Sequence, residues 1–387
     1  MSRFDLRVVH VITGLNDGGA EAVLYRLCKH DHANQHRVVS LLGVGRYGPM
    51  LEALGVPVTT LNMSPGRPSP LAFIRLVRLL RREKPDVVQT WMYHGDLFGG
   101  LAARAAGIRA VVWGIRHTTL EPGKSKKTTI WIGKLLAKLS WWLPAKIVVC
   151  AQQAMDVHEA LGYNRSKMHF IPNGYDLADF QPGLDPKGEL RASLVSDQSN
   201  PLIGMVGRFN PQKDHVNLLD ALVILRDRGV AFRCVLVGTG LDSSNTAIVE
   251  WVAQRGLVDH VLLLGRRNGI PNIMNALDLH VLPSAYGEAF PNVVAEAMAC
   301  GTPCVVTDVG DAAYIVGDTG WVVPPRDASA LAEAIAAAFG DMSDAGKASE
   351  RSLRARQRIE ENFSIERMVN SYSECWNKVI DKVEHRG

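Results

Sequence analysis

Residues 284–301 read SAYGEAFPNVVAEAMACG, and this stretch organises the rest of the chain. Pro291 suits the first turn of a helix, because its fixed φ fits that position and its missing N–H would have no partner there. The helix is expected to begin at Asn292 and to stop at Gly301, a residue type that commonly ends helices. The stretch therefore predicts a loop followed by a short helix with an uncapped amino end.

Two carboxylates flank the amino end of this predicted helix. Glu288 precedes it in a glycine-containing loop, and Glu296 lies one turn inside it, on the face that it shares with Asn292. Free N–H groups and the positive end of the helix dipole favour an anion at such a position. Carboxylates next to an anion site suit a ligand that carries both phosphate and hydroxyl groups, such as a sugar nucleotide. A surface carboxylate beside an ordinary packing helix is the alternative interpretation.

The spacing of these two glutamates, with three further residues between them, resembles the signature of the family 4 retaining glycosyltransferases. The residues between them are Phe290, Pro291 and Asn292. The resemblance covers nearly the whole chain and implies the GT-B fold. That fold consists of two doubly wound, parallel-sheet, Rossmann-like α/β domains that face a central cleft, with a C-terminal helix that crosses back onto the first domain. It also implies that Glu296 binds the ribose hydroxyls and that Glu288 binds the hydroxyls of the donor sugar.

The composition fits two globular domains. The chain has 387 residues, of which 47% are hydrophobic and 21% charged. No apolar run approaches the roughly 18 residues that a membrane span needs. The apolar run near the N-terminus is too short for a signal peptide, so we expect a cytoplasmic protein. The six cysteines are scattered without zinc-ligand spacing, which predicts buried free thiols and no metal site.

Charge is distributed unevenly along the sequence. Residues 1–172 hold 23 Lys+Arg against 11 Asp+Glu, whereas residues 173–387 hold 20 against 28. Within the first half, residues 67–146 alone hold 15 against 4. Such an excess indicates an anionic partner surface. No nucleic-acid-binding motif is present, so we expect no nucleic acid partner.

Short β-branched runs alternate with helical segments in both halves, an order typical of parallel sheets covered by helices. A Pro- and Asn-Gly-containing segment, 171–182, interrupts the rhythm and predicts the domain boundary. We therefore expect an N-terminal acceptor-binding domain over 1–175, a nucleotide-sugar-binding domain over 176–363, and a C-terminal helix in 364–387. The predicted strands are Arg7–Ile12, Arg37–Leu42, Asp86–Thr90, Ala110–Ile115, Lys146–Cys150, Leu202–Val206, Phe232–Val237, Val261–Leu264, Leu279–Leu282 and Cys304–Thr307. The predicted helices include Ala20–Lys29, Pro70–Glu83, Asp96–Ala106, Gln152–Leu161, Asp214–Arg228, Ser244–Arg255 and Ile365–Val383.

A phosphate-binding pair is expected after the first strand of the second half. Arg208 and Lys213 lie in VGRFNPQKD, between a predicted strand and a predicted helix. A planar guanidinium and an ammonium together can hold a diphosphate and stabilise it as its charge grows on departure. The same Arg–x4–Lys pattern matches the phosphate-binding pair of the family. Two solvated basic side chains near a helix start are the alternative.

Glycine-containing loops after other predicted strands complete the candidate site. Gly18 and Gly19 follow the first strand and allow close approach of the backbone to a ligand. Gly238 and Gly240 follow a strand of the second half and keep that region free of side chains. The family resemblance implies that the first glycine pair contacts the donor phosphates and lines the acceptor site. An ordinary strand–helix turn is the alternative for the first pair, and a plain loop is the alternative for the second.

Further candidate residues follow two other predicted strands. The backbone around Arg267 and Asn268 matches the segment with which relatives hold the nucleobase. His117 follows a predicted strand, where a neutral imidazole could contact a donor-sugar hydroxyl or position the acceptor. A loop histidine without function is the alternative. Arg116 beside it is a candidate for an acceptor phosphate.

These observations predict a retaining, metal-independent glycosyltransferase without a cofactor. His117, Arg208, Lys213 and Glu288 would be its catalytic residues. Its donor would be a nucleotide-diphosphate sugar, with uridine as the base, and its acceptor a glycan or a polyprenyl-diphosphate-linked saccharide in envelope polysaccharide assembly. Two alternatives remain open: a GT-B nucleotide-sugar epimerase, and a two-domain sugar or nucleotide binding protein without catalysis.

A basic, tryptophan-containing stretch suggests where such an enzyme works. Residues 124–144 read KSKKTTIWIGKLLAKLSWWLP. Lysines interleaved with tryptophans on an amphipathic stretch suit the headgroup region of an anionic membrane. We therefore expect peripheral association with the inner face of the cytoplasmic membrane. The alternative is a helix that buries its apolar face on the sheet and leaves a solvated basic face.

Overall fold

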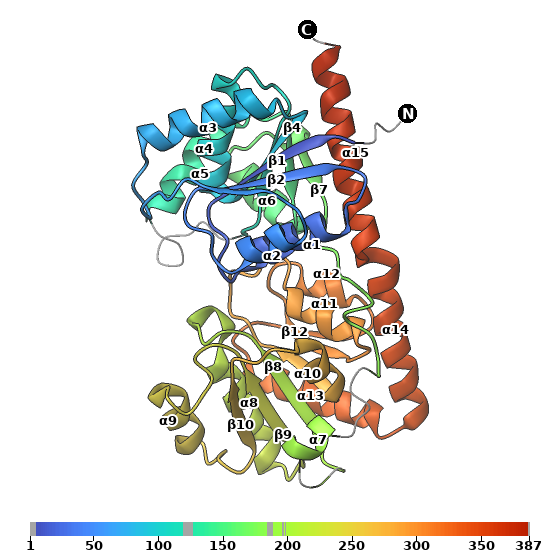
Figure 1. Ribbon diagram of the computed structural model, residues 1–387. Helices are drawn as coiled ribbons and strands as arrows, with labels where there is room; N and C mark the ends of the chain where they lie inside the picture. Colours follow the sequence, from blue (N-terminus) through green and yellow to red (C-terminus); the bar gives the residue numbers. More distant parts are fainter. Residues whose placement is uncertain (1–4, 119–126, 184–188, 196, 198, 386–387) are drawn as a thin grey trace. The chain divides into compact units, whose positions relative to one another are not determined.

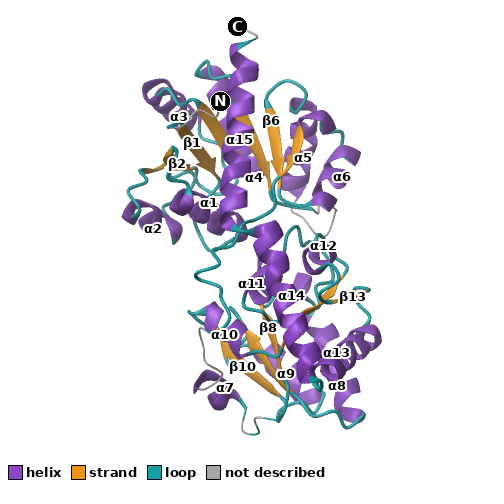
Figure 2. Cartoon of the chain, turned by 90° about the vertical axis from the view of Figure 1, so that its right-hand side faces the viewer, coloured by secondary structure: helices purple, strands orange, loops and turns teal. Residues whose placement is uncertain are grey.

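The computed structural model describes residues 5–118, 127–183, 189–195, 197 and 199–385. Its contacts divide the chain into two compact units. Unit 1 comprises 1–174 and 365–387, and unit 2 comprises 175–364. In each unit a parallel sheet carries helices on both faces (Figure 1 and Figure 2). The prediction of two doubly wound α/β domains is confirmed.

Unit 1 is built on seven strands in the order β3-β2-β1-β4-β5-β6-β7. All the pairings are parallel, and β1 lies between β2 and β4. The chain therefore reverses its direction of winding between β1 and β4, which makes that pair the topological switch point of the sheet. The strands are β1 (Arg7–Ile12), β2 (Gln35–Ser40), β3 (Val58–Thr60), β4 (Val87–Trp91), β5 (Val111–Ile115), β6 (Lys146–Val149) and β7 (Met168–Phe170).

Helices cover the two faces of this sheet in two groups. The helix α1 (Gly19–His30) packs against α2 (Tyr47–Ala53) and against the C-terminal helix α15 (Ile365–Glu384). On the other side, α4 (Met92–Ala105) packs against both α3 (Pro70–Glu83) and α5 (Lys127–Leu139), as Figure 1 shows. The short α6 (Gln152–Ala160) lies next to β6 and β7. A short turn of 3-10 helix, η1, covers Arg165–Lys167.

The C-terminal helix α15 belongs to unit 1, as the predicted crossing back requires. Its buried face joins a core that contains residues of α1 and of the central strands. Trp376 also donates its indole N–H to Gln89 Oε1 of β4 at 3.1 Å, and Ser373 Oγ accepts from Asn34 at 3.1 Å. Because buried polar groups need specific partners, these bonds fix the position of the helix along its axis as well as its apolar face.

Unit 2 is built on six strands in the order β10-β9-β8-β11-β12-β13. Its switch point lies between β8 and β11, which pair directly. The strands are β8 (Leu202–Val206), β9 (Arg233–Val237), β10 (Val261–Gly265), β11 (Leu279–Leu282), β12 (Cys304–Thr307) and β13 (Trp321–Val323).

The helices of unit 2 also form two groups. On one face α8 (His215–Asp227) packs against α9 (Thr246–Gln254) and α13 (Ala328–Met342), over one continuous apolar core. A second group centres on α11 (Asn292–Ala299), which packs against α10 (Ile270–Ala276), α12 (Ala312–Val316) and α14 (Ala345–Phe363). The short α7 (Glu189–Leu194) contacts α10. The 3-10 turn η2 (Pro211–Lys213) immediately precedes α8.

Several predicted boundaries are reproduced and others shift. The predicted ranges of β1, β8, β11, β12 and α3 are those observed. The helix α4 begins at Met92, earlier than the predicted Asp96, because the apolar and glycine residues before Asp96 pack on the sheet. All six cysteines are buried and free, as predicted.

None of the helices in the described part of the chain combines the length and the apolar character that crossing a membrane requires.

Candidate active site

The candidate site of unit 2 lies at the switch point of its sheet. Arg208 follows the end of β8, and Ser284 follows the end of β11, so both lie at the carboxyl edge of neighbouring strands. Open parallel sheets bind ligands at such a point, because the loops on either side diverge there. The fold thus brings together the two sequence segments predicted to hold the donor, although 75 residues separate Lys213 from Glu288.

A buried ion pair joins the two segments. Lys213 Nζ donates to Glu288 Oε1 at 2.7 Å, and the two side chains are only 14% and 8% exposed. Ser284 Oγ donates to the same carboxylate oxygen at 2.7 Å. The Ser284 carbonyl in turn accepts from Thr307 Oγ1 at 2.6 Å, which fixes the start of the loop. The carboxylate is therefore held by a cation and a hydroxyl from two different loops.

The electrostatics of Glu288 follow from these contacts. Burial by itself would raise the pKa of the carboxyl group. The charge of Lys213 and the hydrogen bonds from Lys213, Ser284 and Gln212 outweigh burial, so the pKa of Glu288 is lowered. Glu288 is therefore a carboxylate at neutral pH, which accepts hydrogen bonds and cannot donate them.

Local backbone geometry directs Lys213 toward Glu288. Asn210 caps the 3-10 turn η2 by accepting from the Gln212 N–H at 2.9 Å. Asp214 then adopts a left-handed conformation, with φ 46°, and accepts from the Asn217 N–H at the start of α8. Such a conformation is uncommon for residues other than glycine, and Asp is one of the residues that tolerate it. The left-handed conformation of Asp214 separates the 3-10 turn from α8, so Lys213 ends the turn and lies in the loop before α8.

Gly238 is required by the close approach of two loops. Its φ is 150°, and a Cβ atom at this position would lie 1.9 Å from the carbonyl oxygen of Gly207. No side chain fits there without separating the backbones that follow β8 and β9. Gly240, with φ 78°, faces Phe209 across the same region. These glycines keep the loop after β9 against the loop that carries Arg208. The side chain of Arg208 is exposed.

The helix α11 begins where the sequence predicts. Pro291, with φ −70°, is its N-cap residue, and no side chain caps its first turn. Asn292 Oδ1 accepts from the hydroxyl of Tyr175 at 2.7 Å, and Glu296 is half-buried. The side chains of Phe290 and Pro291 are buried, and Phe290 packs edge-on against Phe363. A ligand at this position would meet the backbone of these two residues.

The predicted nucleobase segment is exposed. Arg267 and Asn268 follow β10 on the same carboxyl edge of the sheet and precede α10. Gly269 adopts a left-handed conformation, with φ 74°, as the N-cap of α10.

In unit 1, the other predicted residues also lie at a carboxyl edge. Gly18 is the N-cap of α1, and the carboxylate of Glu21 lies over it, so that a Cβ at Gly18 would be 2.3 Å from Glu21 Oε2. His117 follows β5 and is exposed, and its ring stacks on Tyr93 with the centroids 5.9 Å apart. Gly19 is the first residue of α1 and is exposed.

Arg116 is engaged within unit 1. Its guanidinium donates to Asn173 Oδ1 at 2.6 Å and to the hydroxyl of Tyr372 in α15, and it stacks over the ring of Trp91 at 4.7 Å. These contacts tie the strand end, the last residues before the unit boundary and the C-terminal helix together. An acceptor phosphate would therefore have to share Arg116 with this network.

A group of potential metal ligands lies in the core of unit 1. His10, Cys28 and His36 are all buried, with their ligand atoms within 4.8 Å of one another. Hydrogen bonds occupy these imidazoles: Trp91 Nε1 approaches His10 Nδ1 at 3.2 Å, His10 Nε2 lies 2.9 Å from His36 Nδ1, and His36 Nε2 lies 3.2 Å from Asp31. One tautomer of each histidine satisfies this relay in its neutral form. Both imidazole rings lie against the indole of Trp376 in α15.

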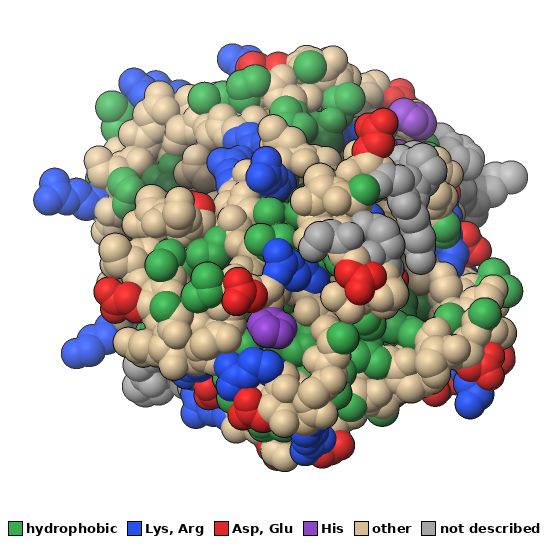
Figure 3. Space-filling model, turned by 90° about the horizontal axis from the view of Figure 1, so that it is seen from below, with side chains coloured by type: hydrophobic (Ala, Val, Ile, Leu, Met, Phe, Trp, Pro, Cys, Tyr) green, Lys and Arg blue, Asp and Glu red, His purple; other side chains and the backbone are tan. Residues whose placement is uncertain are grey.

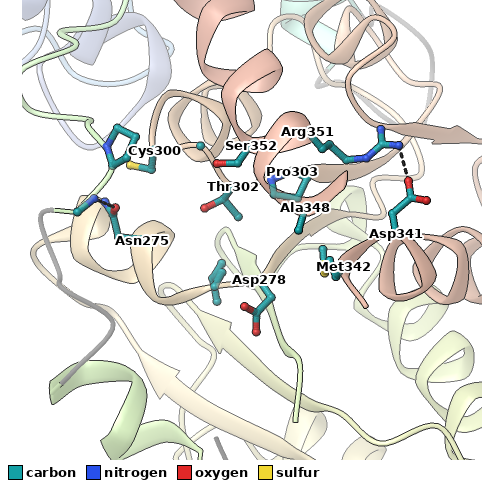
Figure 4. A pocket seen from close by; sticks show the side chains of 14 residues that line it. Asn275, Asp278, Cys300, Thr302, Pro303, Asp341, Met342, Ala348, Arg351 and Ser352 are labelled. Atoms are coloured by element: carbon teal, nitrogen blue, oxygen red, sulfur yellow. Dashed lines mark hydrogen bonds and ion pairs between the residues drawn. The ribbon is translucent and has the colours of Figure 1, made fainter. Parts of the chain in front are cut away.

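A cavity of about 440 Å³ lies at the opposite edge of the unit 2 sheet. It lies at the amino ends of β11 and β12, and Figure 4 shows its lining. Several polar groups that line it are bonded to one another or to the backbone. Arg351 pairs with Asp341, and Asn275 donates to the carbonyl oxygens of Gln181 and Pro271. The cavity lies apart from the ion pair, and among its described lining residues the Nε of Arg351 is the one buried side-chain N or O atom without a hydrogen-bond partner.

Sequence reasoning missed the residues that support Glu288. Gln212, Thr307 and Tyr175 were not singled out, although each contacts a predicted site residue or its loop. The position of Gln212 directly before Lys213 was the available signal. Thr307 and Tyr175 come from distant segments and left no signal in the local pattern.

Comparison with known proteins agrees with the fold. Residues 17–179 match the family described as Glycosyltransferase Family 4, and residues 186–358 match Glycosyl transferases group 1. The chain belongs to this family and is a glycosyltransferase.

Individual relatives cover most of the chain. EpsF of Bacillus subtilis, which is named as a glycosyltransferase, is 30% identical over 315 residues, or 80% of each chain. The UDP-Gal:alpha-D-GlcNAc-diphosphoundecaprenol alpha-1,3-galactosyltransferase of Escherichia coli is 28% identical over 325 residues, again 80% of each chain. Among solved structures, Anabaena HepE in complex with UDP superposes with a TM-score of 0.82 at 22% identity, covering 95% of this chain and 99% of HepE. This last likeness confirms the GT-B fold.

The ion pair predicts a specific pattern of stability. Replacing Lys213 by Met leaves the carboxylate of Glu288 buried without its cation, so the free energy of unfolding should fall by about 3–5 kcal/mol. The Lys213→Met/Glu288→Gln double variant should recover part of that loss, because it buries no unpaired charge. Urea unfolding of the four proteins of this cycle measures the coupling. If the losses of unfolding free energy in the two single variants simply add in the double variant, there is no coupling and the prediction is wrong.

The same cycle has a pH dependence with a definite sign. Because the folded-state pKa of Glu288 is lowered, its stabilising contribution is present above its unfolded pKa of about 4.5 and is lost as the pH falls through the folded value. The difference in the free energy of unfolding between the wild type and Glu288→Gln should therefore narrow below about pH 4.5. Urea unfolding at a series of pH values measures it.

Proposed function

We propose that this glycosyltransferase is a retaining enzyme that transfers a sugar from a UDP-sugar to a hydroxyl group of a polyprenyl-diphosphate-linked saccharide during envelope polysaccharide assembly. The observation that carries the proposal is the Lys213–Glu288 pair at the switch point of unit 2. It places an ammonium and a carboxylate side by side, one suited to a diphosphate and one to sugar hydroxyls. The names of two relatives support the acceptor class, because each specifies transfer to a saccharide on diphosphoundecaprenol or diphospho-undecaprenol. They are the Escherichia coli galactosyltransferase and the N,N'-diacetylbacillosaminyl-diphospho-undecaprenol alpha-1,3-N-acetylgalactosaminyltransferase of Campylobacter jejuni, which is 27% identical over 272 residues.

The donor is held mainly by unit 2. Arg208 and Lys213 bind the diphosphate, and Gly238 and Gly240 leave room for it. Glu296 accepts from the ribose hydroxyls, and the backbone near Arg267 and Asn268 meets the base. Phe290, Pro291 and Asn292 shape the amino end of α11 next to the phosphates. Binding of UDP by Anabaena HepE and the UDP-Gal in the name of the Escherichia coli relative support uridine as the base.

The chemistry is the breaking of the bond between the anomeric carbon and the diphosphate. Positive character develops at the anomeric carbon and negative charge on the leaving phosphate, which Arg208 and Lys213 stabilise. Glu288 accepts from donor-sugar hydroxyls and fixes the ring. The acceptor hydroxyl attacks from the face that the diphosphate leaves, and a phosphate oxygen accepts its proton. The two cations neutralise the leaving group, so the proposed mechanism requires no metal ion.

Unit 1 supplies the acceptor side of the reaction. His117 contacts the transferred sugar or positions the acceptor hydroxyl, with Tyr93 supporting its ring. Gly18 and Gly19 provide the backbone approach at the start of α1. The alpha linkages in the names of the two relatives are those that a retaining enzyme forms from an α-linked donor.

A lipid-linked acceptor requires the enzyme to reach a membrane surface, and α5 presents a suitable face. Lys127, Trp131, Lys134 and Lys138 are exposed and recur at helical spacing on one side of α5. The predicted Lys124 and Lys126 lie outside the described residues. On the face of the molecule seen in Figure 3, by contrast, acidic and basic side chains are interspersed. We place the anionic membrane surface against α5, as a peripheral contact on the cytoplasmic side.

Direct assay tests the reaction. The purified chain is incubated with a panel of UDP-sugars and a polyprenyl-diphosphate-linked N-acetylhexosamine, and the product linkage is assigned by NMR. We expect transfer with an α linkage that is unchanged by EDTA. Inversion at the anomeric carbon would contradict the retaining mechanism. Isomerisation of the donor without acceptor would indicate an epimerase, and binding without turnover a non-catalytic protein.

Two variants separate the roles of the ion pair. Glu288→Gln should lower transfer about 100-fold, because it removes a charged contact to the sugar, while the Kd for UDP stays nearly unchanged. Lys213→Ala should weaken UDP binding and lower kcat/KM by about tenfold or more, since charge-assisted hydrogen bonds contribute roughly 1.5–3 kcal/mol. Lys347→Ala, at an exposed lysine of α14, is the control. Full transfer by a folded Glu288→Gln variant would refute the assignment.

Membrane docking through α5 should depend on charge. The wild type should sediment with anionic vesicles at low salt and less at high salt. The Lys127→Glu, Lys134→Glu, Lys138→Glu variant should lose at least about 100-fold in affinity, at roughly 1 kcal/mol for each basic residue near an anionic surface. Matched substitutions at the exposed Lys347, Lys378 and Lys382 should have little effect. Equal losses in both triple variants would argue for non-specific attraction and a soluble acceptor.

A further inference from the structure

The end of α5 presents two adjacent tryptophans to solvent. Trp141 is 63% exposed and Trp142 is 56% exposed, and Trp131 within α5 is 65% exposed. The other tryptophans of unit 1, Trp91, Trp113 and Trp376, are fully buried. Exposing indole rings costs hydration free energy, so adjacent exposed tryptophans indicate a surface that another phase or molecule covers.

The backbone of this turn is held by an unusual set of side-chain contacts. Lys167 Nζ lies 2.9 Å from the carbonyl oxygen of Ser140, 2.7 Å from that of Trp141 and 2.9 Å from that of Pro144. Arg104 of α4 donates to the carbonyl oxygen of Trp142 at 2.8 Å. The last carbonyl groups of a helix and those of the turn after it lack intrahelical partners, and two cations satisfy them here. The turn is therefore rigidly mounted on its neighbours.

The indole N–H of Trp141 is already satisfied inside the protein. It donates to the carbonyl oxygen of Gly162 at 3.2 Å, even though most of the ring is exposed. Moving a polar N–H from water into an apolar medium costs free energy unless it keeps a hydrogen bond. Because Trp141 keeps its bond to Gly162, its ring can enter an apolar medium without that cost. This is the property expected of an indole that inserts, rather than one that only rests on a wet surface.

The neighbouring surface favours a lipid bilayer over a protein partner. The exposed lysines of α5, Lys127, Lys134 and Lys138, lie on the helix that leads into the turn. Leu101, also exposed, lies one helical turn before Arg104 on α4. Apolar rings surrounded by several cations match the boundary between anionic headgroups and acyl chains. The described side chains of this stretch of α5 include no acidic group.

We propose that the Trp141–Trp142 turn is an interfacial anchor that inserts into the outer acyl region of the bilayer, and that Lys167 is the positioning residue that holds it in the inserting conformation. The inference rests on the proposed action on a lipid-linked acceptor. It adds to the charged docking face a second, apolar component that salt does not weaken. The anchor would fix how unit 1 is oriented on the membrane, whereas lysines alone permit several orientations.

The experiment separates the two components with vesicles of anionic phospholipid. Sedimentation is measured at low salt and at about 1 M salt, where the Debye length is about 3 Å and charge attraction is largely screened. The wild type and the Lys127→Glu, Lys134→Glu, Lys138→Glu variant should both keep a salt-resistant fraction. Trp141→Ala/Trp142→Ala should lower that fraction's affinity by roughly tenfold or more. Trp141→Phe/Trp142→Phe, which keeps apolar rings, should retain most of it.

Depth is measured with vesicles whose acyl chains carry bromine, a short-range quencher of indole fluorescence. Quenching should be seen in the wild type and lost in Trp141→Phe/Trp142→Phe. Lys167→Met should reduce both quenching and salt-resistant binding, while Lys167→Arg, which can also donate to several carbonyls, should restore part of them. Transfer to a short-chain, water-soluble acceptor should be unchanged in Trp141→Ala/Trp142→Ala. This unchanged activity is the control that the variant is folded.

The outcomes distinguish the inference from the function on which it rests. Vesicle binding that is abolished by salt, without bromine quenching, would overturn the anchor and leave charge-based docking intact. No vesicle binding at all, with full transfer to a soluble acceptor, would overturn both the anchor and the membrane-linked acceptor. A wild-type dimer that Trp141→Ala/Trp142→Ala converts to a monomer would identify the turn as a contact between copies of this chain, and would overturn the lipid anchor.

Discussion

The site of unit 2 depends on one buried ion pair. Lys213 and Glu288 are individually costly to bury, and each is tolerated because the other is 2.7 Å away. Their bond joins the loop after β8 to the loop after β11, the two loops that diverge at the switch point of the sheet. A pair at this position closes the local structure, and in the proposed reaction it also presents opposite charges to a ligand. Under that proposal structural and functional demands fall on the same two residues, and the surrounding glycines and hydroxyls support the same geometry.

Unit 1 follows a different principle, in which polar groups are buried to specify a packing arrangement. Trp376, Tyr372 and Ser373 of α15 each bond to a group in the body of unit 1. The His10–His36 relay lies beneath the same helix, and Trp376 packs edge-on against His10. An apolar helix face alone would permit sliding by a turn, whereas directional bonds do not. The last helix of the chain is thereby fixed on the domain that begins it.

The surface of unit 1 carries a third kind of feature, which neither folding nor catalysis explains. Lys167 and Arg104 satisfy the carbonyl groups of a turn that exposes two indoles. Stability would be served as well by a polar residue at either position. Charged side chains that hold exposed tryptophans in place have a purpose if the tryptophans enter an apolar medium. Catalysis on a lipid-linked substrate would supply such a medium, and it would explain why the basic excess of the chain is concentrated around this region.

Local sequence patterns were sufficient to predict the fold class and most of the elements. Alternating β-branched runs predicted β1, β8, β11 and β12 with their observed bounds, because period and turn residues act over a few positions. The loop–helix pattern around Pro291 predicted α11 and its uncapped start for the same reason. Resemblance to a family then indicated which residues of these loops to consider, including Arg208, Lys213 and Glu288.

Only the tertiary structure decided which of these residues meet. The sequence assigned Lys213 to the diphosphate and Glu288 to the sugar, as separate contacts, and gave no sign that they bond to each other across 75 residues. It predicted that Gly238 keeps its region free of side chains, but only the fold shows that a Cβ there would lie 1.9 Å from the backbone of Gly207. Tyr175, Thr307 and Lys167 were silent in the sequence, because their partners come from distant segments. Local pattern determines elements, since it acts through neighbouring residues. Strand order and burial determine which side chains share a site, since these are properties of the assembled sheet.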